Sequence, residues 1–160
     1  MRNIHILCVG RLKEKFYTDA VSEYSKRLGA YCDLRVTELA EERLPQNPSQ
    51  AQIDAALSKE AAAIRAKLPP GSAVVALCVE GKLRSSEELA ALMEDWATDA
   101  AKHLVFLIGG SYGLDEGLKR EARMRLSMSP MTFPHHLARV MLLEQIYRAF
   151  KISEGSSYHK

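Results

Sequence analysis

A chain of 160 residues with 47% apolar residues is long enough to bury one hydrophobic core and too short for two ordinary ones, so a single domain over residues 1–160 is expected. The formal net charge of +2 is too small to identify or to exclude a nucleic-acid partner. The three cysteines lack the spacing of a metal site, which predicts neither a disulfide nor a bound metal. The amino-terminal apolar run is short and gives way at once to charge, which predicts a cytoplasmic protein without a membrane span.

In chain order, apolar periodicity predicts five strands that alternate with five helices. The runs typical of strands are 4–9, 34–39, 74–79, 104–108 and a short one near Leu126. The stretches with helical spacing are 16–28, 49–68, 85–96, 114–122 and 134–152. Capping boxes, Ser49 with Gln52 and Ser85 with Glu88, mark two helix starts. The polar stretch 40–48 has two prolines and no period, which predicts a mobile loop.

This alternation predicts an α/β fold, with a mostly parallel sheet and helices on both faces. In such sheets ligands gather at the carboxyl ends of strands. The loops that follow Val79 and Ile108 are therefore the candidate ligand sites, and they contain Glu80–Lys82 and Gly109–Gly113. Glycine there lets backbone amides approach a ligand closely.

The glycine loop matches neither common nucleotide-binding pattern. Gly109, Gly110, Gly113 and Gly117 lack the G-x-G-x-x-G spacing, the loop follows the fourth predicted strand rather than the first, and there is no Walker pattern. Two interpretations stay open. The glycines form a ligand site, or they only end a strand and begin a turn.

The last predicted helix has apolar side chains around almost its whole circumference. They are Leu137, Val140, Met141, Leu142, Leu143, Ile146, Tyr147 and Phe150. A single sheet face cannot cover all of them, so a homodimer is favoured. The alternative is a helix buried wholly within its own chain, which a domain of this length seldom achieves.

Several motifs spread over the whole chain carry a family resemblance. They are Val9-Gly10, Tyr24 with Arg27, the block from Leu77 through Gly81-Lys82 to Ser85-Ser86-Glu87, Leu107-Ile108-Gly109-Gly110 with Gly113, the run from Ser127 to Ile152, and Tyr158-His159-Lys160. Together they resemble the knotted SPOUT-class methyltransferases, and among these the small bacterial enzymes that methylate N3 of a pseudouridine in large-subunit rRNA.

The resemblance implies a carboxyl-terminal trefoil knot, which no pattern argument would yield because knots are almost absent from folds. It implies S-adenosylmethionine as methyl donor, no metal, and a homodimer that acts on 23S rRNA within ribosomal particles. The implied donor contacts are Leu77, Gly109, Met128, Ser129, Pro130, Met131, Thr132 and Phe133. The family usually has proline before the terminal Tyr-His, whereas this chain has Ser157, which predicts a looser tail.

Methylation of a ring N–H requires a positioned base, or a cation that stabilises the developing anion. We expect His159, Tyr158 and Arg139 to fill the catalytic roles; a histidine beside an aromatic residue at an exposed terminus suits RNA contact or proton handling. His135 and His136 begin the last helix, where capping or packing explains them.

Other charged residues have two possible roles. Arg139 and Arg148 pair with Glu144 or bind phosphate. A basic cluster either follows the RNA backbone or is simply solvated, and it consists of Lys119, Arg120, Arg123 and Arg125. Two other functions remain possible: a knotted tRNA methyltransferase, and a non-catalytic, ribosome-associated RNA-binding protein of the same fold.

Overall fold

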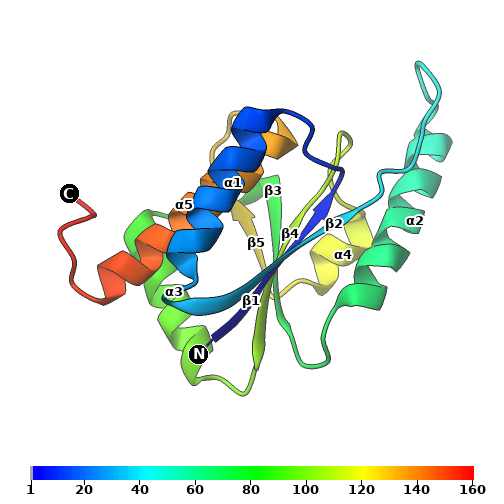
Figure 1. Cartoon of the computed structure of the whole chain (residues 1–160). Helices are drawn as coiled ribbons and strands as arrows, with labels where there is room; N and C mark the ends of the chain where they lie inside the picture. Colours follow the sequence, from blue (N-terminus) through cyan, green and yellow to red (C-terminus); the bar gives the residue numbers. More distant parts are fainter. Residues whose placement is uncertain (1) are drawn as a thin grey trace.

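A computed structural model describes residues 2–160 and shows a five-stranded sheet between two layers of helices (Figure 1). Strands and helices alternate in the predicted order. The strands are β1 (Arg2–Val9), β2 (Cys32–Leu39), β3 (Ala73–Leu83), β4 (His103–Ile108) and β5 (Met124–Ser127). The helices are α1 (Lys15–Leu28), α2 (Gln50–Lys67), α3 (Ser86–Thr98), α4 (Glu116–Glu121) and α5 (His135–Ser153).

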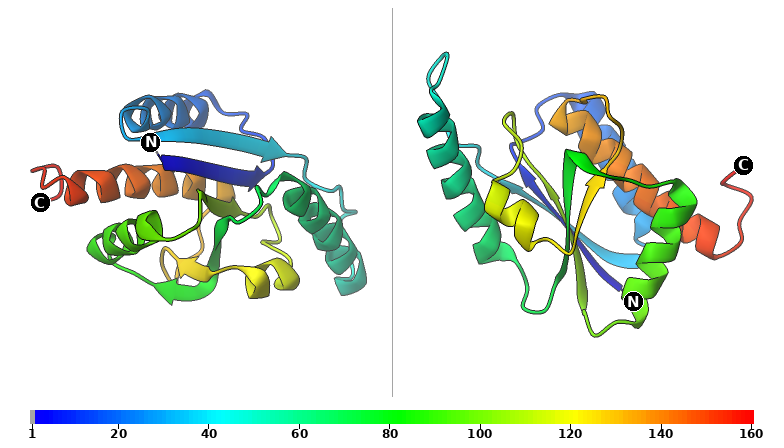
Figure 2. Two further views of the ribbon diagram at one scale, coloured as in Figure 1. Left: turned by 90° about the horizontal axis from the view of Figure 1, so that it is seen from below. Right: turned by 180° about the vertical axis from the view of Figure 1, so that it is seen from behind.

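The strand order is β2-β1-β4-β3-β5, and every neighbouring pair is parallel. Helices α1, α3 and α5 cover one face of the sheet, and α2 and α4 cover the other (Figure 2). The predicted α/β class, with helices on both faces, is therefore confirmed. The trefoil knot stays a prediction from the resemblance. No helix within residues 2–160 is long and apolar enough to cross a lipid bilayer.

Strand β3 differs from its prediction. A continuously apolar run such as 74–79 predicts a strand covered on both faces, which is wrong for its second half, where 46% of Val79 is exposed. The reason is that β3 pairs with β4 only as far as Ala76. Its pairing with β5 then shifts, so that both Leu77 and Lys82 lie opposite Leu126. The intervening residues are released from the sheet to form other contacts.

Both predicted capping boxes are confirmed. At the start of α2, Ser49 Oγ accepts from the backbone N–H of Gln52, and the Gln52 side chain accepts from that of Ser49. Ser85 and Glu88 make the same pair of bonds at the start of α3. These bonds satisfy backbone donors that a helix start otherwise leaves unpaired.

Helix α5 packs between α1 and α3 with a fully buried stripe that includes Leu142, Leu143 and Ile146. Part of its apolar surface stays only partly covered by the chain itself. The partly covered residues are Leu137, Val140, Met141, Tyr147, Phe150 and Ile152. A helix wholly buried in its own chain is therefore not what the structure shows.

Candidate functional site

A cavity of about 590 Å³ lies at the carboxyl ends of β3, β4 and β5. Its walls come from Leu77–Glu80, from the loop that follows β4, and from residues between Leu126 and Ala138. The volume lies within the range of about 300–1,000 Å³ that small-molecule sites occupy. Of the two stretches that the sequence marked as ligand sites, Gly109–Gly113 lines this cavity, together with the segment before α5. The prediction of a loop at Glu80–Lys82 is wrong, because these residues belong to β3, and only Glu80 lines the cavity.

The structure gathers most of the residues that the resemblance assigns to the methyl donor. Seven of these eight residues line the cavity: Leu77, Gly109, Met128, Ser129, Met131, Thr132 and Phe133. The eighth, Pro130, is exposed and does not belong to the lining. Residues from three segments, separated by 32 and by 19 positions, therefore form a single surface.

The glycine loop is a tight turn that leads out of β4. The backbone N–H of Gly113 donates to the carbonyl oxygen of Gly110 over 3.1 Å, and Gly113 has a φ of 79°, in the region that favours glycine. A Cβ atom on Gly109 would overlap the backbone of Gly113. The turn alone therefore requires glycine at two positions, and this same turn forms a wall of the cavity.

Within residues 2–160, Lys119 is the only lysine or arginine that lines the cavity, and its charge is compensated. Its Nζ lies 2.5 Å from a carboxylate oxygen of Glu80 and 2.7 Å from one of Glu116. Burial by itself would lower the pKa of Lys119, but its hydrogen bonds to Glu116 and Glu80 outweigh that effect and raise the pKa. The same bond from Lys119 lowers the pKa of Glu80. The positive charge of Lys119 in the cavity wall is thus offset by Glu80 in the same wall and by Glu116 outside it.

Because Lys119 is paired in this way, it does not contribute free positive charge to the predicted basic cluster. Its side chain is only 9% exposed, so it does not face an RNA backbone. Arg123 is paired as well, with Asp99 at 2.5 Å. Arg120 and Arg125 remain exposed. An RNA-tracking role is thus restricted to part of that cluster.

His135 lies in the cavity wall at the first position of α5. It does not cap the helix, because residue 134 holds the N-cap position and no side-chain cap bond is present. Burial, together with the nearby charge of His136, lowers the pKa of His135. A neutral imidazole at pH 7 follows, so the lining holds no uncompensated positive charge.

Arg139 does not reach the cavity. It is 1% exposed, and its guanidinium donates to Glu38 Oε2 over 2.6 Å and to the carbonyl oxygen of Gly10 over 3.1 Å. It therefore ties α5 to the carboxyl ends of β1 and β2. Within one chain this expected catalytic residue is a buried structural link. Of the two predicted pairings with Glu144, that of Arg139 is wrong, because its counter-charge is Glu38, and that of Arg148 is confirmed.

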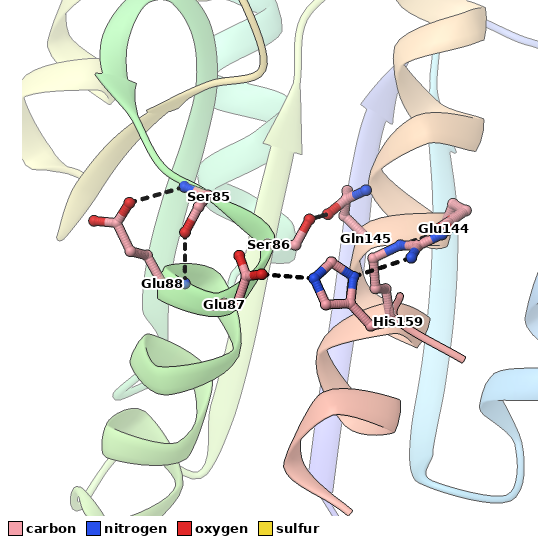
Figure 3. Close-up of polar contacts among 8 residues, drawn as sticks. Ser85, Ser86, Glu87, Glu88, Glu144, Gln145 and His159 are labelled. Atoms are coloured by element: carbon pink, nitrogen blue, oxygen red, sulfur yellow. Dashed lines mark hydrogen bonds and ion pairs between the residues drawn. The ribbon is translucent and has the colours of Figure 1, made fainter. Parts of the chain in front are cut away.

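The carboxyl-terminal tail is bound to its own chain (Figure 3). His159 Nε2 lies 2.6 Å from Glu87 Oε1 on α3, and its Nδ1 lies 3.1 Å from Arg148 Nη1 on α5. The guanidinium of Arg148 also lies 4.8 Å from the centre of the Tyr158 ring. These contacts hold the tail although Ser157 replaces the proline that is usual in the family. The sequence did not reveal that Glu87 and Arg148 are partners of His159.

The cavity and the tail contact different parts of α5. Ala138 is the last residue of α5 in the cavity lining, whereas Tyr158 and His159 contact Glu144 and Arg148 on later turns and do not line the cavity. The structure therefore does not bring Tyr158 and His159 to the cavity of the same chain.

Sequence reasoning found no function for the stretch 40–48, yet the structure places it beside the cavity. Glu41 Oε1 accepts a hydrogen bond of 2.8 Å from the backbone N–H of Ser111 in the glycine loop. The available signal was the position of this stretch after a parallel strand, since such loops gather at one edge of the sheet. Periodicity did not reveal which strands are neighbours.

Comparison with known proteins identifies the family of this chain. Residues 2–159 match the family described as predicted SPOUT methyltransferase. The chain is 48% identical over 158 residues to the ribosomal RNA large subunit methyltransferase H of Bifidobacterium animalis subsp. lactis, and the alignment covers 99% of each chain. It is 42% identical, with the same coverage, to the protein of that name from Leuconostoc mesenteroides subsp. mesenteroides. This chain belongs to the SPOUT methyltransferase family.

Proposed function

We propose that this protein methylates RNA of the large ribosomal subunit with S-adenosylmethionine as methyl donor, bound in the 590 Å³ cavity. The observation that carries the proposal is the 48% identity, over 99% of both chains, to an enzyme named for that RNA. The cavity supports it, because seven of the eight residues expected to contact the donor line this one cavity.

The cavity suits a donor that carries a positive sulfonium. Lys119 is held between two carboxylates, and His135 is neutral, so no lining side chain repels a cation. Leu77, Met128 and Phe133 offer apolar surface for an adenine ring. S-adenosylmethionine supplies a methyl group on positively charged sulfur, and the residues of the chain orient that group and exclude water from it.

The finer proposal is that the acceptor is N3 of a pseudouridine in 23S rRNA, methylated within the ribosomal particle. That nitrogen must lose a proton as it gains the methyl group, so a basic group has to lie nearby. His159 and Tyr158 are the proposed catalytic residues, with His159 as proton acceptor or RNA contact. Arg139 acts on the reaction only as a positioning residue, through the ends of β1 and β2.

A homodimer reconciles the position of the tail with that of the cavity. In one chain they contact different turns of α5, since Ala138 lines the cavity and the Tyr158 hydroxyl lies 3.5 Å from Glu144 Oε1. Two copies packed through α5 with opposite directions would bring the tail of one copy to the cavity of the other. The partly covered apolar residues of α5, among them Met141 and Tyr147, supply surface for such a contact.

Calorimetry with S-adenosylmethionine tests the donor site. We expect saturable binding that S-adenosylhomocysteine competes for, and at least a tenfold loss in Thr132→Trp, whose ring would fill the cavity from an exposed wall position. Thr98→Trp, an exposed threonine at the end of α3, is the matched control and should bind like the wild type. A wild-type protein that binds neither compound would favour the non-catalytic alternative.

The RNA substrate is tested by mass spectrometry of RNA from a strain that lacks the gene. We expect one modified uridine of 23S rRNA to lose a methyl group and to regain it when the wild-type gene is restored. Unchanged rRNA would refute the assignment. Loss of a methyl group from tRNA instead would select the tRNA alternative.

A further inference from the structure

The glycine loop is held in place by a side chain from a distant part of the chain. Glu41 Oε1 accepts the Ser111 N–H at 2.8 Å, across 70 positions of sequence. The same carboxylate covers Gly110, where an added Cβ atom would come within 2.6 Å of Oε1. Glu41 thus lies directly against the outer side of the loop whose inner side lines the cavity.

Packing does little to hold this part of the loop. Ser111 is exposed, and 49% of Tyr112 is exposed. Behind them lies a second cavity of about 610 Å³, enclosed by residues 41–45, by α2 and by Ser111 and Tyr112 themselves. The loop therefore has open space on its outer side, and the hydrogen bond from Ser111 to Glu41 crosses that side.

Glu41 is itself fixed by a neighbouring contact. The backbone N–H of Glu42 donates to Glu60 Oε2 over 2.9 Å, and Glu60 is only 7% exposed on α2. This bond anchors the stretch 40–48, predicted to be mobile, to a helix next to Glu41. A bond from an amide to a carboxylate is stronger than one between neutral groups. Two hydrogen bonds, from Glu42 to Glu60 and from Ser111 to Glu41, therefore connect α2 to the glycine loop through two adjacent residues.

We infer that Glu41 is a positioning residue for donor binding: its carboxylate holds the Gly109–Gly113 loop in the shape that the methyl donor requires. The inference rests on the proposed function, because it assumes that the cavity binds S-adenosylmethionine. Glu41 does not line the cavity, so it acts through Ser111 rather than by contact with the donor.

Three variants of the chain test whether donor binding depends on the Glu41 carboxylate as a hydrogen-bond acceptor or only on negative charge in this region. Glu41→Ala removes the acceptor, and we expect the Kd for S-adenosylmethionine to rise about tenfold. Glu41→Gln keeps an oxygen that can accept the Ser111 N–H, so it should recover most of the affinity. Glu42→Ala is the matched control, since it removes an adjacent carboxylate while it keeps the backbone N–H that binds Glu60.

Two further measurements exclude a general loss of structure. The KM for the donor should rise in Glu41→Ala while kcat at saturating donor stays near the wild-type value, because no reacting group is changed. Amide hydrogen exchange should speed up in the peptide that holds residues 109–113, and should stay unchanged in β1 and β4.

The outcomes are distinguishable. If the wild type binds the donor and Glu41→Ala binds it equally well, the inference fails and the proposed function stands. Unchanged exchange in residues 109–113, or a Glu41→Gln protein as weak as Glu41→Ala, would also overturn the positioning role. A wild type that does not bind S-adenosylmethionine overturns the proposed function and this inference together.

Discussion

The inferred role of Arg139 changes once its partner in the structure is known. In the sequence it is a cation that could stabilise the anion developing on the ring nitrogen, which suggested a catalytic role. In the structure it is 1% exposed and bound to Glu38, 101 positions away. A buried charge is costly unless it is paired, so the presence of Glu38 explains why an arginine is tolerated there.

Removal of Glu38 should therefore destabilise the whole protein. We expect Glu38→Ala to lower the free energy of unfolding by about 3 kcal/mol, because it leaves the Arg139 guanidinium buried without a counter-charge. Urea denaturation measures the change. Glu23→Ala is the control, since its partner Arg27 is exposed and that pair contributes at most about 1 kcal/mol. Similar losses in both variants would contradict the argument.

The contribution of Glu38 should also depend on pH. Burial raises the pKa of Glu38, but hydrogen bonds from Arg139 and from the backbone N–H of Leu12 outweigh it and lower the pKa from its ordinary value of 4.5. A carboxylate with a lowered pKa stabilises the fold above its unfolded pKa and loses that effect as the pH falls through the folded pKa. The stability difference between wild type and Glu38→Ala should thus shrink below pH 4.5 and stay constant from pH 6 to 8.

At the scale of the element, the turn after β4 requires glycine for its own backbone and also lines the cavity proposed to bind the donor. Because a Cβ on Gly109 would overlap the Gly113 backbone, even Gly109→Ala has to displace the turn. We expect it to lower the melting temperature and to weaken donor binding at least tenfold. Thermal unfolding and calorimetry measure the two effects.

Gly29→Ala is a suitable comparison for Gly109→Ala. Gly29 ends α1 with a φ of −57°, which any residue adopts, and it is absent from the cavity lining. Its added Cβ would lie 3.3 Å from one backbone oxygen, which is tight but not an overlap. If Gly109→Ala bound the donor as well as Gly29→Ala, the turn would not be part of the donor site.

At the scale of the whole molecule, the separation of tail and cavity predicts that an active site needs two chains. Thr132→Trp should disable the cavity, and His159→Ala should disable the tail while it leaves donor binding intact. A heterodimer of these two chains, purified through two different tags, would keep one complete site and about half of wild-type activity. Each variant alone should show little activity.

A heterodimer of His159→Ala with Tyr158→Ala is the control for that experiment. Both defects then lie in the tail, so no complete site forms and activity should stay low. Equal activity in the two heterodimers would contradict the exchange of tails. Sedimentation velocity on each purified protein checks that the chains are dimers.

The sequence by itself determined the order and type of the elements, because apolar periodicity and capping boxes are local properties of the chain. It also indicated that the loop after β4 forms part of a ligand site, since strand ends in parallel sheets share one edge. The exposed second half of β3 escaped prediction, as an apolar run does not record where its pairing with β4 stops.

Only the tertiary structure decided which charged side chains form ion pairs and which loops are joined by hydrogen bonds. Lys119 meets Glu80 across 39 positions, Glu41 meets Ser111 across 70, and Arg139 meets Glu38 across 101. Each pairing follows from the strand order β2-β1-β4-β3-β5 and the helices packed on it. Local periodicity does not encode strand order, because order depends on the packing of the complete sheet.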